Sequence, residues 1–419
     1  CKRVFQYFPQ EKAGKVWGTA VNWNKQKRPW GSAEEAFGLK QTRRKDMTFD
    51  SWKKREDGKA GKNRRRYPAG RRVFAGAVLL IGAFVLQTAA RNLEGFGQWY
   101  AVTVYPVLVG TFGRFFGIFP FSASELGLYL LLLGILWYGI RHIRRPAEIV
   151  KSGFFAASLL FFLYTVNCGV NYYRDPFSSY LEIELRESSV EELDSLCRLL
   201  EDKTAQAAEL LLEDGSLSPD KEERKTFPAL AKQAMEGLGE KYPQLKGYYP
   251  RPKPLLLSEI LSVQSLAGIY SPFTVEANYN EDMMAYNIPH TACHELSHLR
   301  GFMREDEANF IGFLACINSD SPYFCYSGYL TAYVYAHNAL YRQDAEGALE
   351  IYYSLPEEVL SDLSANNAFW QQYEGKISEA SSRVNDTYLK ANSQTDGIQS
   401  YGRMVDLLLG YYRSQLAAE

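Results

Sequence analysis

Three residues of one short segment have the types and spacing to bind a metal ion and act on a water molecule beside it. His294, Glu295 and His298 form the pattern His-Glu-x-x-His. Residues four apart lie on one face of a helix, so both imidazoles can point at one zinc ion about 2.0 to 2.1 Å away. Glu295 would reach a zinc-bound water without binding the metal, which is the position of a general base. The pattern predicts one catalytic zinc ion.

Two other interpretations of this motif carry less weight. An ordinary amphipathic helix can expose two histidines, but the chain has only five. A chance match to the pattern is therefore rare, on the order of one in a few hundred. A site inside the bilayer is disfavoured because polar residues flank the motif, at 276–287 and 300–307. His290, four residues before the motif's first histidine, is expected to be a capping or core residue.

A catalytic zinc site needs a third protein ligand and an open position for water. Glu305 lies seven residues beyond His298, which is about 10 Å along an unbroken helix. A turn at Gly301 can bring Glu305 back towards the histidines, because a glycine just after a helix can turn the chain back in a left-handed conformation. The residues from Arg304 onward then predict a second helix with acidic residues in its first turn.

Glu305 and Glu307 are both available as that ligand. At about 100° per residue, Glu305 lies on a face of mostly small residues that allows close packing against the histidine helix, whereas Glu307 points the opposite way. The pattern favours Glu305, with Asn309 one turn on as a hydrogen-bond partner of a histidine ligand. Glu307 stays as the alternative, and the glutamate that does not bind becomes a structural ion pair or cap. The small-residue face consists of Glu305, Ala308, Asn309, Gly312 and Cys316.

Zinc hydrolases usually also place a donor near the oxyanion that develops during the reaction. The candidates in the next helical region are His337, Tyr323, Tyr326 and Tyr329. Each is more often a packing residue than a chemical one, because the chain has 29 tyrosines.

Residues 175–419 must position these side chains. We expect them to form a mainly helical domain with a small sheet. Residues 190–212 repeat leucine at helical spacing, and 268–279 are rich in strand-forming residues. Within that stretch, 273–280 is either an edge strand that pairs with an extended peptide or a plain sheet strand.

Three apolar segments precede this domain, at about 73–90, 124–140 and 153–173. Each approaches the length that crosses a hydrocarbon core of about 30 Å, so we expect three membrane spans rather than buried helices. Residues 95–113 are also uncharged, but Pro106 and glycines interrupt them. We expect that stretch to be interfacial or re-entrant.

Charge is distributed unevenly and indicates the orientation. Residues 1–72 hold 21 basic and 7 acidic residues, whereas the rest of the chain holds 26 basic and 41 acidic ones. Basic clusters precede the first apolar segment and separate the second from the third. Three spans put both clusters in the cytoplasm and the C-terminal domain outside a bacterial cytoplasmic membrane. The N-terminal basic segment is expected to be disordered and to contact lipid, and no nucleic-acid partner is expected.

Six scattered cysteines without a C-x-x-C pair exclude a zinc ribbon or a dithiol redox site. Cys316 and Cys325 are the pair best spaced for a disulfide, with free buried thiols as the alternative.

The order of motifs resembles a bacterial family of membrane proteins, the domain-of-unknown-function family 3810, over about residues 73–415. The resemblance implies a gluzincin-like zincin domain behind a membrane anchor, with metal roles for His294, His298 and a glutamate of 305–307. It implies no substrate. The motifs are Phe119-Pro-Phe-Ser, Asn171-Tyr-Tyr-Arg-Asp-Pro-Phe, Gly268-Ile-Tyr-Ser-Pro-Phe-Thr-Val-Glu-Ala-Asn, His294-Glu-Leu-Ser-His, Arg304-Glu-Asp-Glu-Ala-Asn-Phe, Tyr388-Leu-Lys-Ala-Asn and Ser400-Tyr-Gly-Arg.

Taken together, the sequence predicts a basic segment (1–72), a helical membrane anchor (73–174) and a mainly α, α+β zincin-like metallopeptidase domain (175–419). We expect a multi-pass zinc metalloprotease that hydrolyses peptide bonds of a peptide or protein substrate. The alternatives are a non-catalytic scaffold that binds peptides or is stabilised by zinc, and a hydrolase of another amide such as one in the cell wall.

Overall fold

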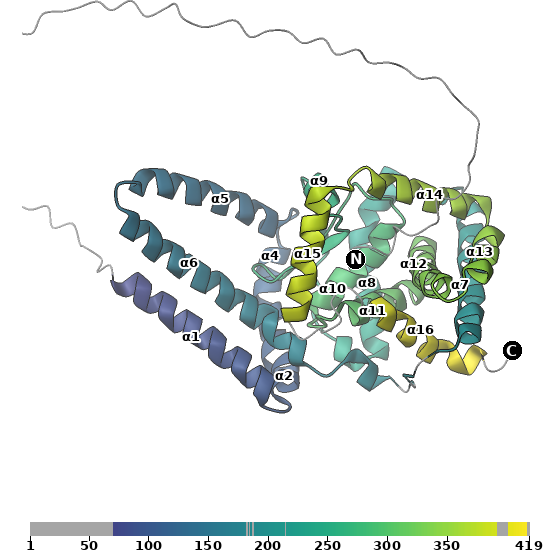
Figure 1. Cartoon of the computed structure of the whole chain (residues 1–419), viewed down its shortest axis with the longest axis horizontal. Helices are drawn as coiled ribbons and strands as arrows, with labels where there is room; N and C mark the ends of the chain where they lie inside the picture. Colours follow the sequence, from purple (N-terminus) through teal and green to yellow (C-terminus); the bar gives the residue numbers. More distant parts are fainter. Residues whose placement is uncertain are drawn as a thin grey trace, which may run out of the picture. The chain divides into compact units, whose positions relative to one another are not determined.

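The computed structural model describes residues 70–416, except 182, 184, 187, 214 and 392–400. The predictions for residues 1–69 lie outside this range. The described chain is mostly helical with one three-stranded sheet, as the sequence predicts (Figure 1). The five described cysteines are free, Cys316 and Cys325 included.

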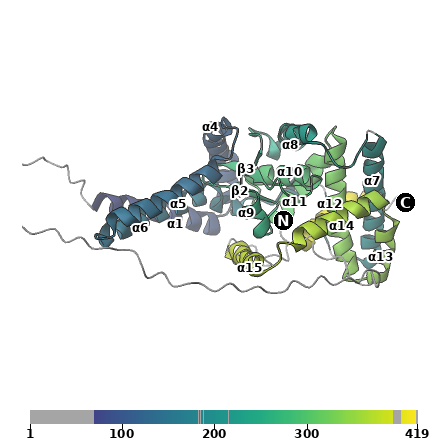
Figure 2. The same cartoon turned by 90° about the horizontal axis from the view of Figure 1, so that it is seen from above.

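Three helices are long and apolar enough to cross a membrane. They are α1 (Gly70–Asn92), α5 (Ala123–His142) and α6 (Pro146–Asn167), and the third apolar stretch continues to Tyr173. The third helix begins seven residues before the expected span, because Pro146 fits the first turn of a helix and the charged residues after it stay helical. Figures 1 and 2 show all three extending from one side of the remaining fold.

The interrupted segment after α1 forms a run of short helical pieces rather than a fourth candidate span. Its side chains Tyr100, Tyr105 and Val109 are buried in the core of the C-terminal domain. The Tyr105 hydroxyl donates to the carbonyl of Leu299 at the end of the motif helix, 3.0 Å away. This segment therefore contacts the end of the helix that carries the histidine motif. The pieces are α2 (Phe96–Trp99), η2 (Tyr100–Val104), α3 (Tyr105–Leu108), η3 (Val109–Gly113) and α4 (Arg114–Gly117).

The C-terminal helices enclose a core rich in Leu, Phe and Tyr. The first of them, at residues 190–213, confirms the helical spacing of leucines. Three 3₁₀ turns join the parts: η4 (Gly169–Tyr173), η5 (Phe177–Tyr180) and η6 (Pro243–Leu245). The helices are α7 (Val190–Glu213), α8 (Lys221–Lys241), α9 (Glu259–Val263), α10 (Asn287–Leu299), α11 (Glu305–Ile317), α12 (Pro322–Tyr341), α13 (Ala345–Ser354), α14 (Glu357–Gln371), α15 (Lys376–Ala391) and α16 (Tyr401–Leu416).

The sheet has the order β1-β3-β2, with β1 (Lys253–Pro254) parallel and β2 (Gly268–Ser271) antiparallel to β3 (Glu276–Tyr279). The central position of β3 shows that the edge-strand hypothesis for 273–280 is wrong, since both sides of β3 are paired. The two-residue β1 carries no strong strand pattern, so the sequence could not show that β3 has a second neighbour. Among the described strands, β2 keeps an open edge.

A buried ion pair joins strands β1 and β3 of the sheet. The Lys253 ammonium contacts the Glu276 carboxylate, and both side chains are nearly inaccessible to solvent. Removing one partner leaves a buried charge uncompensated, which costs about 3–5 kcal/mol. We therefore expect Lys253→Met to lower the apparent melting temperature of the detergent-solubilised protein.

The matched control is Lys246→Met, because Lys246 pairs with Glu240 on the surface, where both side chains are exposed. An exposed pair contributes about 0–1 kcal/mol. Equal melting temperatures for the two variants would contradict a stabilising role of the buried pair.

Candidate metal centre

The motif helix α10 and the following helix α11 are joined by a tight turn. Gly301 has a φ of +94°, in the left-handed region, as expected from the sequence. A side chain at Gly312 of α11 would meet the main chain of His290 and His294 at 3.2–3.3 Å. The small-residue face therefore packs closely against the histidine helix, and the turn brings the two helices side by side.

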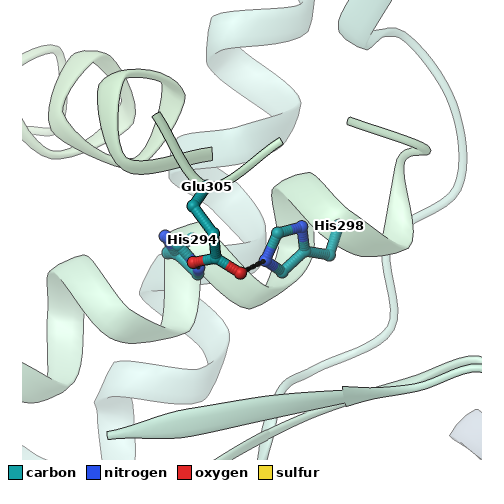
Figure 3. A group of neighbouring side chains, drawn as sticks. All are labelled: His294, His298 and Glu305. Atoms are coloured by element: carbon teal, nitrogen blue, oxygen red, sulfur yellow. Dashed lines mark ion pairs between the residues drawn. The ribbon is translucent and has the colours of Figure 1, made fainter. Parts of the chain in front are cut away.

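This packing brings His294, His298 and Glu305 together (Figure 3). The Nε2 atoms of His294 and His298 lie 3.5 and 3.6 Å from the two carboxylate oxygens of Glu305. A tetrahedral zinc ion with bonds of about 2.0–2.1 Å separates its ligand atoms by about 3.4 Å. The three side chains thus fit one zinc ion, with all candidate ligand atoms within 4.8 Å of one another.

The hydrogen bonds and burial of the two histidines suit them to this role. Nδ1 of His298 donates to the carbonyl oxygen of Phe302 at 2.8 Å, which leaves Nε2 as the atom that faces Glu305. Burial lowers the pKa of His294 to about 3, so its imidazole is neutral, the form that binds metals. Burial also disfavours the charged form of His298, but Glu305 outweighs this effect and raises its pKa. A bound dication would instead lower the pKa of His298, because its positive charge disfavours a protonated imidazole.

Glu295 points into the same cavity but is not one of the three clustered residues. Burial raises its pKa to about 7. The Oε2 atom is buried and has no hydrogen-bond partner among the described residues. A main-chain hydrogen bond from Tyr270 of β2 holds the carboxylate. The structure therefore places a carboxylate with one unpartnered oxygen, Oε2, beside the three clustered residues.

Gly268 provides the room for this carboxylate. A Cβ at Gly268 would lie 2.6 Å from Oε1 of Glu295 and 2.8 Å from the methyl group of Thr291. On the sequence-based prediction that Glu295 is a general base, we expect Gly268→Ala to displace it and to lower kcat about 10- to 100-fold, since small misplacements of such a group are costly. Zinc content, measured by metal analysis, should not change.

A control for this substitution is Gly237→Ala in α8, where a Cβ would meet no other atom within 4 Å. If Gly268→Ala retains the wild-type kcat, the close approach of β2 does not position Glu295.

The cavity that contains the cluster has a volume of about 340 Å³. Its walls come from α10 and α11, from β2, from Cys168 directly after α6, from Tyr172 of η4, and from α15 through Val384 and Tyr388. The hydroxyl of Tyr172 donates to that of Tyr388 at 3.1 Å. Sequence reasoning missed both tyrosines as site residues, although each lies in a motif of the family resemblance.

The remaining predicted residues lie elsewhere. Glu307 accepts a hydrogen bond from the main chain of Phe177 at 3.1 Å and lies near Arg304, so it has a structural environment. Asn309 is buried, and its carbonyl oxygen lies 3.0 Å from Nε2 of His290, which is a core residue as expected. A hydrogen bond from the Asn309 side chain to a ligand histidine stays a prediction.

None of the oxyanion candidates is among the described residues that line the cavity. His337 bonds to the Ala348 carbonyl. The hydroxyls of Tyr323 and Tyr326 donate to Glu223 and Asp362. Tyr329 packs on Phe313. Their spacing along α12 therefore reflects packing rather than chemistry.

Comparison with known proteins gives one family. A family model described as "Protein of unknown function (DUF3810)" matches residues 100–409, most of the chain. No curated protein and no solved structure matches.

Proposed function

The chain belongs to the DUF3810 family, whose description assigns no function, and from the geometry of the site we propose that it is a membrane-anchored zinc metallopeptidase. One observation carries the proposal: His294, His298 and Glu305 converge in a cavity that also holds Glu295. Two histidines and a carboxylate with an open fourth position are typical of catalytic zinc sites.

In this proposal each residue has a separate task. His294, His298 and Glu305 would hold the ion, and a bound zinc ion would supply the Lewis acidity that lowers the pKa of water and polarises a carbonyl. Glu295 accepts the proton of the attacking water and passes it to the leaving amine. Its raised pKa in the buried site suits a group that must both take and give a proton near neutral pH.

The open edge of β2 favours a peptide as the substrate. Gly268, Ile269 and Tyr270 of this strand line the cavity. An extended chain can pair with such an edge through main-chain hydrogen bonds, which fixes a peptide bond next to the ion.

We propose that Tyr388, which lines the cavity, donates a hydrogen bond to the developing oxyanion. Burial raises its pKa well above the ordinary value, so it stays protonated at neutral pH. We expect Tyr388→Phe to lower kcat by up to about 100-fold with KM little changed, because the donor acts on the transition state.

Steady-state kinetics on a cleaved peptide checks this prediction. The control is Tyr353→Phe, which alters an exposed tyrosine of α13. An equal kcat for Tyr388→Phe and wild type would remove Tyr388 from the mechanism.

We also propose the orientation expected from the charges. Arg72 donates hydrogen bonds to Tyr138 and Ser152, which puts the start of α1 beside the α5–α6 connection. Arg72 therefore lies at the same end of the helices as the basic residues between α5 and α6. The positive-inside rule makes that end cytoplasmic and the C-terminal domain extracytoplasmic.

Zinc K-edge X-ray absorption on the purified full chain tests the metal site. The proposal predicts one zinc ion with two imidazoles, one carboxylate and one water-derived ligand. Four protein ligands would indicate a structural site and support the scaffold alternative instead.

A further inference from the structure

The substrate class can be inferred from how the cavity is attached to the membrane helices, and this step rests on the proposed function. Cys168, which lines the cavity, directly follows the last residue of α6. Asn167 at that helix end donates to the carbonyl of Pro272 at 2.8 Å, and the Tyr270 hydroxyl donates to the Asn167 carbonyl at 3.1 Å. The chain that directly follows the third apolar helix thus lines the cavity, and the helix end itself is bonded to β2 and the residues after it.

The sheet is also attached to the start of α5. The Glu276 carboxylate accepts hydrogen bonds from the main-chain N–H groups of Ala123 and Ser124 at 3.2 and 2.8 Å. The Glu125 carboxylate accepts from the N–H groups of Leu256 and Leu257 at 2.7 and 2.9 Å. The ends of two apolar helices therefore hold the sheet whose strand β2 lines the cavity.

Helix lengths place these contacts relative to the bilayer. At about 1.5 Å per residue, the 20 residues of α5 and the 22 residues of α6 span about 30 and 33 Å. A hydrocarbon core is about 30 Å thick, so Ala123 and Asn167 both lie at the same boundary. The cavity begins within about one helical turn of that boundary.

The surface next to these contacts is apolar. Leu256 is 70% exposed and Leu257 54% exposed, although α5 holds their main chain in place. Ile269 of β2 and Phe273 after it are each 43% exposed. Side chains of this kind suit the lipid interface rather than bulk water. Figures 1 and 2 also show α15, which lines the cavity, on the side of the domain from which the apolar helices extend.

We propose that the substrate is itself anchored in the membrane and is cut in its juxtamembrane segment. An extended chain advances about 3.3 Å per residue, so a site this close to the bilayer acts within about ten residues of a substrate's own anchor. The shared membrane also raises the effective concentration of such a segment near β2.

The test uses the zinc-loaded full chain in vesicles of phosphatidylethanolamine and phosphatidylglycerol. The first reporter is an apolar helix of about 21 residues followed by a randomised polar segment of about 12 residues. A second reporter inserts a Gly-Ser spacer of about 40 residues between helix and segment. The third is the soluble segment alone. Glu295→Gln is the control for contaminating proteases, and mass spectrometry locates the cuts.

We expect the first reporter to be cut at least about tenfold faster than the other two, within about ten residues of its helix. Equal cutting of all three reporters would overturn the substrate inference and leave the peptidase proposal intact. No cutting of any reporter by the wild type would overturn both.

Discussion

Replacing Glu295 by Gln is expected to lower kcat for peptide cleavage by about 10²–10⁴-fold and to leave the zinc content unchanged. An amide has almost the same shape as the carboxylate but cannot accept a proton, so the general base is lost while the fold is kept. Glu295 is outside the cluster of His294, His298 and Glu305, so metal binding does not depend on it. Kinetics and metal analysis of the same preparation check both halves of the prediction.

A suitable control is Glu358→Gln, which changes an exposed glutamate of α14. This variant should match the wild type in kcat and zinc content. Equal turnover by Glu295→Gln and the wild type would falsify the assignment of Glu295 as the base.

Replacing Glu305 by Gln is expected to reduce zinc affinity by more than about 100-fold and to abolish most activity. The loss of a ligand carboxylate should cost at least as much as the 10- to 100-fold measured for groups that merely support ligands. Competition with a zinc-binding dye measures the affinity, and activity should return partly at high zinc concentration.

The chain offers a matched control for this variant two residues away. Glu307 lies in the first turn of the same helix and is buried, but its carboxylate contacts the main chain of Phe177. Glu307→Gln should therefore retain zinc. The opposite pattern, with zinc lost in Glu307→Gln and kept in Glu305→Gln, would show that Glu307 and not Glu305 is the third ligand.

Local patterns in the sequence predicted the part of the site that depends on helix geometry. Four-residue spacing put His294 and His298 on one face, and Gly301 marked the left-handed turn that the structure shows. The small residues of α11 predicted its close packing against α10, which Gly312 confirms. Each of these features involves residues that are neighbours along the chain, so short-range periodicity was enough.

The walls of the cavity could not be predicted in the same way. Tyr172 and Tyr388 meet across 216 residues of sequence. Apolar and aromatic patterns show which face of a helix packs against other parts of the fold, but they do not show which other segment that face meets. The same limit explains why the contact of Tyr105 with the end of α10 was missed. The sequence of an uncharged helical segment beside a membrane span does not show whether lipid or protein surrounds that segment.

Peptide cleavage by this chain is expected to require a zinc ion held by His294, His298 and Glu305. The most direct measurement is cleavage of a mixture of unstructured peptides by the full chain, followed by mass spectrometry as zinc is removed with a chelator and then restored. We expect cleavage with about one zinc ion per chain, no cleavage after removal, and recovery with added zinc. Cleavage that continues without metal, or its absence in a chain that holds one zinc ion, would show that this chain is not a zinc peptidase.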